Sequence, residues 1–135
     1  MINIIAAAAI ALGTWIYVPG GTWVPSKQVV HTAAASLERA VKAQAVKEHR
    51  SLSAWSGYTF QYQGRTLQVQ GKPHKSVKVL FVYGFCPQPP AAQKWVSEHG
   101  HEEFLLVNDG GTCYFRAYYD PTTKKYIGVV FNGLA

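Results

Sequence analysis

"SKQVVHTAAASLERAVKAQAVK", residues 26–47, is the stretch that decides the fold. Its apolar residues recur at intervals of three and four, the spacing of one face of an α-helix. They are Val30, Ala33, Ala34, Leu37, Ala40, Val41 and Ala45. Ser26 is a residue type that caps helices, and Pro25 before it favours extended backbone. The spacing therefore predicts one long amphipathic helix that begins near Lys27.

After this helix the hydrophobic period changes to two, which is typical of strands. The predicted strands are residues 58–63 and 65–70, which form a hairpin with Gly64 at the turn, then 76–85, 102–108, 112–120 and 126–133. Residues 76–85, "SVKVLFVYGF", are apolar throughout and so predict a central strand. The last three form an antiparallel meander, and a short helix is expected from about Ala91 to Glu98. The fold class is thus α+β, with the long helix packed on an antiparallel meander sheet.

The N-terminal stretch is uncharged from residue 2 to residue 18, "INIIAAAAIALGTWIYV". Its length is close to that of a bilayer-spanning helix, and Trp15, Tyr17 and Trp23 lie where aromatic rings favour the headgroup layer. The stretch predicts a hydrophobic helix that anchors the protein, with a cleaved signal peptide as the alternative. The domain plan is then an anchor or signal segment at 1–19, a linker at 20–26 and a single α+β domain at 27–135.

The chain is basic, with 13 Lys and Arg against 7 Asp and Glu among 135 residues, a formal net charge of +6. A positive surface favours anionic partners, among them phospholipid headgroups. The basic residues are spread from Lys27 to Lys125, and no run of them resembles a nucleic-acid-binding arm. We therefore do not expect a nucleic-acid partner, and a basic surface that keeps a small domain soluble explains the charge as well. The membrane is expected as a partner from the uncharged N-terminal stretch.

The two cysteines, Cys86 and Cys113, allow three interpretations: a disulfide, a catalytic thiol or two buried free thiols. A nucleophile would need a base and an electropositive, exposed setting, which the flanking Thr112 and Tyr114 do not provide. Adjacent strands could bring the two cysteines together, so we predict a disulfide. A disulfide favours a periplasmic or extracellular domain, whereas the basic residues that follow the N-terminal segment favour the cytoplasmic side.

"SEHGHEE", residues 97–103, is the densest group of metal-ligand side chains. His99 and His101, two residues apart, could share a metal with Glu102. A helix end explains the same residues, because the helix dipole favours His99 and Gly100 suits a cap. We find no cofactor motif and assign no catalytic residue.

The segment after Cys86 is the predicted site for a protein partner. A disulfide would hold the proline-rich loop and the following residues as an ordered surface. On that surface Trp95 and Lys94 are the expected contacts, because aromatic anchors supply much of the energy of an interface.

The order of a long helix followed by a meander resembles the cystatin-like and NTF2-like α+β domains, some of which are periplasmic modules behind one transmembrane helix. The chain also resembles a type IV pilin, although Ile5 stands where that family has a glutamate and Pro19 interrupts the helix. These resemblances imply a membrane-tethered, non-enzymatic binding module of a cell-envelope, secretion, pilus or phage-encoded assembly, and they leave a homo-oligomer open. The alternative is a small enzyme or metal-binding protein that uses the His99, His101 and Glu102 cluster.

Overall fold

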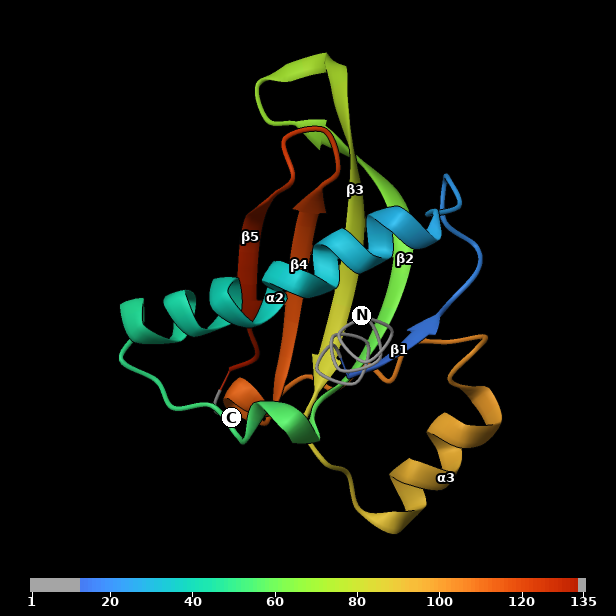
Figure 1. Cartoon of the computed structure of the whole chain (residues 1–135), viewed down its shortest axis with the longest axis vertical. Coiled ribbons are helices and arrows are strands. Elements are labelled where there is room, and N and C mark those ends of the chain that lie inside the picture. The colour runs from blue at the N-terminus through green and yellow to red at the C-terminus, as the bar shows by residue number, and fades with distance from the viewer. Residues whose placement is uncertain (1–12, 134–135) are drawn as a thin grey trace, which may run out of the picture.

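One sheet organises the computed structural model, which describes residues 13–133. Its strands lie in chain order: β1 (Thr14–Tyr17), β2 (Thr59–Val69), β3 (Lys72–Phe85), β4 (Tyr114–Asp120) and β5 (Lys125–Phe131). β1 runs parallel to β2, and the other neighbours are antiparallel (Figure 1). The α+β class and the antiparallel arrangement of β2 to β5 confirm the coarse prediction.

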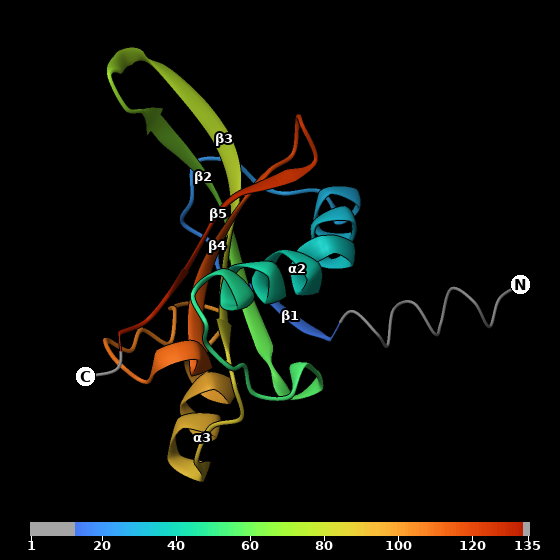
Figure 2. The ribbon, with the colours of Figure 1, turned by 90° about the vertical axis from the view of Figure 1, so that its left-hand side faces the viewer.

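The long helix α2 (Lys27–Lys47) covers one face of this sheet (Figure 2). The Ser26 side chain caps it by accepting a hydrogen bond from the Val29 N–H at 3.2 Å. Its buried residues are Ala33, Leu37, Val41 and Ala45, all from the predicted apolar stripe. They pack on a core of Tyr58, Phe60, Leu80, Val82, Phe115, Ala117, Tyr119 and Phe131. The helix and its buried face are therefore as the sequence predicts.

The opposite face of the sheet carries a second core and the short helix α3 (Pro90–His99). Phe81, Tyr83 and Phe85 of β3 are buried there against Val96 of α3 and against Phe104 and Leu105. Successive residues of a strand point to opposite faces. β3 is buried on both faces along its second half, which explains why residues 79–85 read as a continuous apolar run.

Gly64 does not turn the chain, and this prediction was wrong. β2 continues through Gly64 as a single strand of 11 residues, and the hairpin to β3 turns at Gln70 and Gly71. A Cβ at Gly64 would lie 2.2 Å from the carbonyl oxygen of Trp23, which pairs with it in an isolated bridge. The glycine permits this close backbone contact. It also shows that the predicted linker, residues 20–26, runs against the sheet.

Residues 102–108 form no strand, in contrast to the prediction. After α3 they pass through a turn and an irregular segment that lies over the second core. Successive residues of a strand point to opposite faces, but Phe104 and Leu105 both pack against the second core. Side chains of the sheet, described below, replace the missing backbone partners.

The N-terminal helix predicted for residues 2–18 is also wrong in its last part. Thr14–Tyr17 form β1, and the Trp15 ring packs at a tilt against the rings of Phe60 and Tyr62, with centroids 5.1 and 5.9 Å away. Residues 1–12 lie outside the described part of the chain. Within residues 13–133 no helix has the length and apolarity to cross a bilayer.

Candidate partner-binding groove

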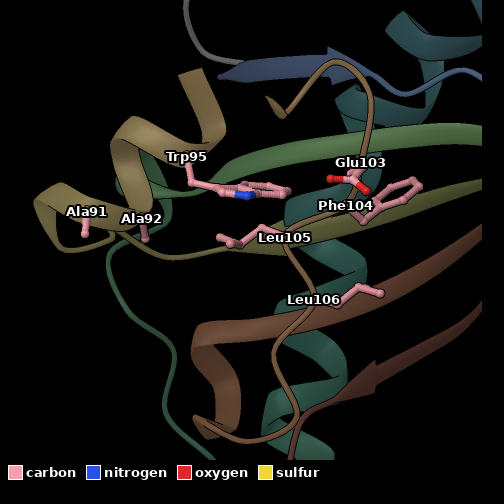
Figure 3. Close-up of a pocket in the computed structure, with 7 residues that line it drawn as sticks. All are labelled: Ala91, Ala92, Trp95, Glu103, Phe104, Leu105 and Leu106. Carbon is pink, nitrogen blue, oxygen red and sulfur yellow. The ribbon is translucent and has the colours of Figure 1, made fainter. Parts of the chain in front are cut away.

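An open groove of about 750 Å³ runs between α3 and the segment that follows it. One wall consists of Ala91, Ala92 and Trp95 of α3, and the other of Glu103, Phe104, Leu105 and Leu106 (Figure 3). Leu106 is 66% exposed, although it is one of the largest apolar side chains in the segment. The two alanines are small, so they leave the indole of Trp95 open to the groove. The side chains of the lining are aliphatic or aromatic except for that of Glu103.

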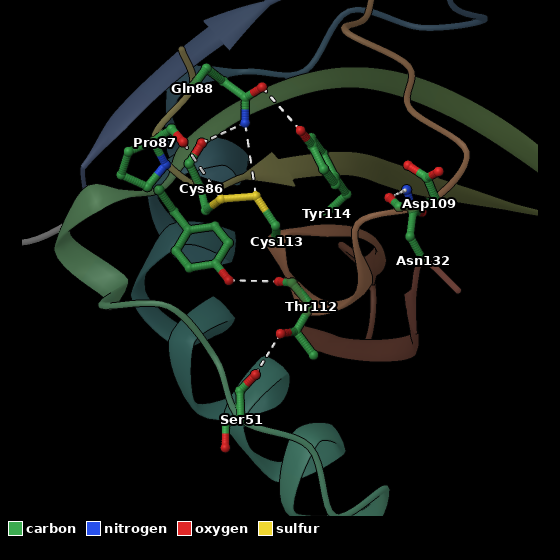
Figure 4. Close-up of a disulfide and its surroundings, with 10 residues drawn as sticks. Ser51, Cys86, Pro87, Gln88, Asp109, Thr112, Cys113, Tyr114 and Asn132 are labelled. Atoms are coloured by element: carbon green, nitrogen blue, oxygen red, sulfur yellow. Dashed lines mark hydrogen bonds between the residues drawn. A yellow bond between two sulfur atoms is a disulfide. The ribbon is translucent and has the colours of Figure 1, made fainter. Parts of the chain in front are cut away.

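The N-terminus of α3 is positioned by prolines and by a glutamine next to the disulfide. Pro90 occupies the first turn, where a missing N–H costs nothing. The Gln88 amide donates to the Cys86 carbonyl at 2.8 Å, and its oxygen accepts from the Tyr114 hydroxyl at 3.0 Å (Figure 4). Gln93 in α3 donates to the Gln88 carbonyl at 2.7 Å. These bonds connect the start of α3 to the end of β3 and the start of β4.

The second wall is held by one buried side chain, that of Gln61 in β2, which is 0% exposed. Its amide nitrogen donates to the carbonyls of Gly100 at 2.9 Å and Glu103 at 2.8 Å. Its amide oxygen accepts from the Leu105 N–H at 2.8 Å. Breaking these hydrogen bonds would leave buried polar groups without partners, which is energetically costly. The Gln61 amide therefore fixes the position of the backbone that it contacts. Gln61 thus fixes the end of α3 and the second wall relative to the sheet.

Two further polar side chains secure the segment beyond the groove. The Tyr83 hydroxyl accepts from the Val107 N–H at 3.2 Å, and burial raises the pKa of Tyr83 to about 12. The amide of Asn132 donates to the carbonyls of Val107 and, at 2.9 Å, Asp109. The wall therefore does not depend on strand pairing for its order.

A cation supports the base of the second wall. The Arg65 guanidinium lies over the Phe81 ring at 3.7 Å from its centroid and over the Phe104 ring at 5.3 Å. Such stacking attracts a cation to an aromatic face and is strengthened by partial burial. Burial also lowers the pKa of Arg65, which remains charged at neutral pH because an arginine begins from 12.5. Phe104 is thus held from the sheet side while its other side faces the groove.

Acidic residues are concentrated where α3 ends and the second wall begins, a segment that we call the rim, in contrast to the rest of the chain. Three of the seven carboxylates, Glu98, Glu102 and Glu103, fall within residues 98–103. Only Glu98 has a basic partner among the described residues, Lys94, at 3.9 Å and largely exposed. Such an exposed pair contributes little to stability. Two carboxylates next to the groove are therefore open to a cationic partner.

The structure separates the two predicted partner contacts. Trp95 lines the groove, whereas Lys94 does not, and its side chain is 80% exposed on the neighbouring flank of α3. The residues that sequence reasoning missed are Gln61 and the apolar pair Leu105 and Leu106. A glutamine within the alternating aromatic stretch "YTFQYQ" was the available signal for Gln61, since it falls on the face opposite the aromatic side chains.

The predicted metal ligands lie at the end of α3 and in the turn after it. The His99 ring packs beside Trp95 with ring centroids 5.5 Å apart, and His101 and Glu102 are exposed. Across residues 13–133 no three or more His, Cys, Asp or Glu side chains gather in a way that could hold a metal ion. The metal site stays a prediction for which the structure supplies no ligand group.

The disulfide between Cys86 and Cys113 confirms the predicted pairing, with α-carbons 4.9 Å apart. Phe85 and Tyr114, the adjacent residues, are already paired across β3 and β4. Cys113 lies in a short 3₁₀ turn, Gly111–Cys113, rather than inside the strand as expected. Because its sulfur is bonded, Cys113 is a structural residue in this fold.

Comparisons with protein-family models, with curated proteins and with solved structures found no match to this chain. The resemblance to cystatin-like, NTF2-like and pilin domains accordingly stays a prediction that rests on the order of elements. The function must be argued from the groove itself.

Proposed function

We propose that the protein is a non-enzymatic binding module whose groove holds a short apolar segment of a protein partner. The observation that carries this proposal is an apolar groove with the Trp95 indole open on one wall and an otherwise irregular wall fixed by Gln61. A site that is ordered before binding loses little conformational entropy when the partner arrives. Tryptophan is also among the residues that most often dominate interface energies.

The charge of the rim indicates what the partner carries. Glu102 and Glu103 are exposed carboxylates beside an apolar groove, in a chain of formal net charge +6. A segment with one or two large apolar side chains next to a lysine or arginine would fill the groove and pair with these carboxylates. Complementary charge of this kind adds specificity and speeds association more than it adds affinity.

Binding is favoured over catalysis by the state of the cysteines. The thiol considered as a nucleophile is bonded to Cys86, and the groove lining offers one carboxylate as its only ionisable side chain. General acid–base chemistry ordinarily uses paired groups with matched roles. One exposed carboxylate in an apolar lining fits recognition better.

The disulfide also supports a location outside the cytoplasm, because such bonds persist in oxidising compartments. We place the module in a cell-envelope, secretion, pilus or phage-encoded assembly, with the apolar residues before β1 as its attachment to the membrane. Reporter fusions at Ala135 test the location. Activity from a reporter that works only in the cytoplasm would reverse it.

Selection of peptides from a random phage-displayed library on the full-length protein tests the groove. We expect the selected peptides to share a large apolar residue beside Lys or Arg. Trp95→Ala should weaken their binding about tenfold or more, in line with the loss of an aromatic anchor. Val46→Ala is the matched control, since Val46 is 75% exposed on α2, and it should leave binding unchanged. Equal binding to both variants, or no selected peptide, would refute the proposal.

A further inference from the structure

The end of the β2–β3 hairpin extends beyond α2 and beyond the rest of the sheet (Figures 1 and 2). We call residues 66–78 the arm. Its strands are paired through Leu67 with Val77 and Gln68 with Ser76, and the register shifts just before the tip. Residues 70–76 are exposed throughout. The arm is therefore a two-stranded ribbon with an exposed tip, in which Leu67, Val69 and Val77 are half-buried.

The charge on the arm has one sign. It carries Lys72, Lys75 and Lys78, and the chain has no aspartate or glutamate between Glu48 and Glu98. None of the three lysines forms an ion pair within the described residues, although the Lys78 ammonium lies 5.9 Å from the centre of the Trp23 ring. Three uncompensated ammonium groups on one projecting element form an attachment point for an anionic surface.

The two faces of the arm differ. Leu67 and Val77 form a cross-strand pair on the same face as Arg65 and Phe81, and Val69 follows two residues further along β2. The opposite face presents Thr66, Gln68, Ser76 and Lys78. Neither hydrophobic core of the described chain includes the three aliphatic residues. The arm is thus both cationic and amphipathic.

We propose that the arm binds the surface of an anionic lipid bilayer, with Leu67, Val69 and Val77 at the headgroup boundary, Lys72 and Lys75 near the tip against lipid phosphates, and Lys78 adding positive charge from the opposite face. A combination of basic residues and one apolar face is the chemistry of interfacial binding, and each Lys near an anionic surface adds attraction. The inference does not depend on the groove, which lies on α3 and residues 103–106.

Nucleic acid fits this arm less well. Single strands are bound mainly by large aromatic side chains on which bases stack, and residues 66–78 contain no Phe, Tyr or Trp, with His74 as the one ring. The aliphatic row has no general counterpart on a phosphate backbone. The Cys86–Cys113 disulfide also favours an oxidising compartment, where lipid surfaces are present.

Vesicle flotation of the full-length protein tests the proposal, with phosphatidylcholine vesicles compared with equimolar phosphatidylcholine and phosphatidylglycerol. We expect stronger binding to the anionic vesicles that decreases with added salt. The variant Lys72→Gln, Lys75→Gln, Lys78→Gln should bind them about tenfold more weakly, or weaker still. The control Lys47→Gln, Lys124→Gln, Lys125→Gln loses the same charge elsewhere and should stay within about twofold of the unmodified protein, because screening limits the range of surface charges.

The apolar row is tested separately by Val69→Trp. The protein already has four tryptophans, so the emission of residue 69 is taken as the difference between the variant and the unmodified protein. This difference should shift to the blue on the anionic vesicles and should be quenched by lipids brominated near the headgroups. Absence of both changes would refute the interfacial position of the arm. Equal loss in the two triple-lysine variants would assign binding to overall charge, and no preference for anionic vesicles would remove the proposal. Tighter binding to a DNA duplex, lost in the arm variant alone, would replace the membrane with nucleic acid.

Discussion

At the scale of single residues, Gln61 holds the second wall of the groove against the sheet. It is a fully buried polar side chain, and its three hydrogen bonds connect the sheet to the end of α3 and to the second wall. Trp95 lines the other wall directly, whereas Gln61 does not line the groove and acts by holding the backbone of the second wall in place. The binding proposal therefore depends on one half-buried aromatic residue that lines the groove and one buried amide.

Replacing Gln61 with leucine should lower the free energy of unfolding by about 2–4 kcal/mol, because two carbonyls and one N–H lose their partner in a buried setting. Urea unfolding measures the loss. Hydrogen exchange should become faster at Gly100–Leu105 before it does so in α2. Gln68→Leu changes an exposed residue of the same strand and should have little effect on either measurement. Unchanged exchange in the second wall of the Gln61 variant would contradict the role given to this side chain.

Tyr83 makes stability sensitive to alkaline pH. Burial raises its pKa from 10.0 to about 12, so the folded protein keeps the phenol proton to higher pH than the unfolded chain does. Its contribution is complete below pH 10 and is lost as the pH rises to about 12. Between these values Tyr83→Phe should make the decline in unfolding free energy shallower by up to about 1.4 kcal/mol per pH unit. Parallel declines in the two proteins would show that Tyr83 is not the group that titrates.

At the scale of secondary structure elements, the sequence was most informative where one periodicity governed a whole segment. α2 was predicted from its first residue because capping and spacing agreed, and β3 was predicted as central from its apolarity. β2 and residues 102–108 were misread for the same physical reason. The conformations at Gly64 and Phe104 are set by contacts with residues far away in the sequence. The local sequence pattern carries no information about those contacts.

The close approach at Gly64 predicts that Gly64→Ala is destabilising. The new Cβ would meet the Trp23 carbonyl at 2.2 Å and its ring at 2.8 Å, so residues 20–24 would have to move off β2. We expect a loss of about 1–3 kcal/mol in unfolding free energy, as for other overpacked sites. Gly128→Ala is the control in β5, where the nearest atom would lie at 3.6 Å. Similar stability of the two variants would show that the segment is not held against Gly64.

The disulfide is predicted to stabilise the fold more than to shape it, because β3 and β4 already pair beside it. Closing a loop of 27 residues corresponds to about 3.5 kcal/mol of unfolded-chain entropy. The double variant Cys86→Ser, Cys113→Ser should lose about this much by urea unfolding. Below its unfolding transition it should still bind the selected peptides. Loss of peptide binding in a variant that remains folded would show that the disulfide shapes the groove directly.

At the scale of the whole molecule, the two faces of the sheet differ in how completely they are covered. α2 closes one face with a continuous apolar core, while α3 and residues 103–106 cover the other only in part and leave the groove open. The predicted membrane helix does not extend over residues 14–17, because these residues form the edge strand β1. Composition had predicted a membrane segment through residue 18, and only the pairing with β2 shows that residues 14–17 form a strand instead.

The central claim is that the groove binds a protein partner, and photo-crosslinking in cells of the source organism tests it most directly. A photoreactive phenylalanine would replace Ala91, an exposed residue of the groove wall, and in a second strain Val46 on α2. The account predicts one discrete crosslinked protein from position 91 that is absent from position 46 and is lost when Trp95→Ala is added. The same products from both positions, or a product at 91 that persists without Trp95, would contradict it.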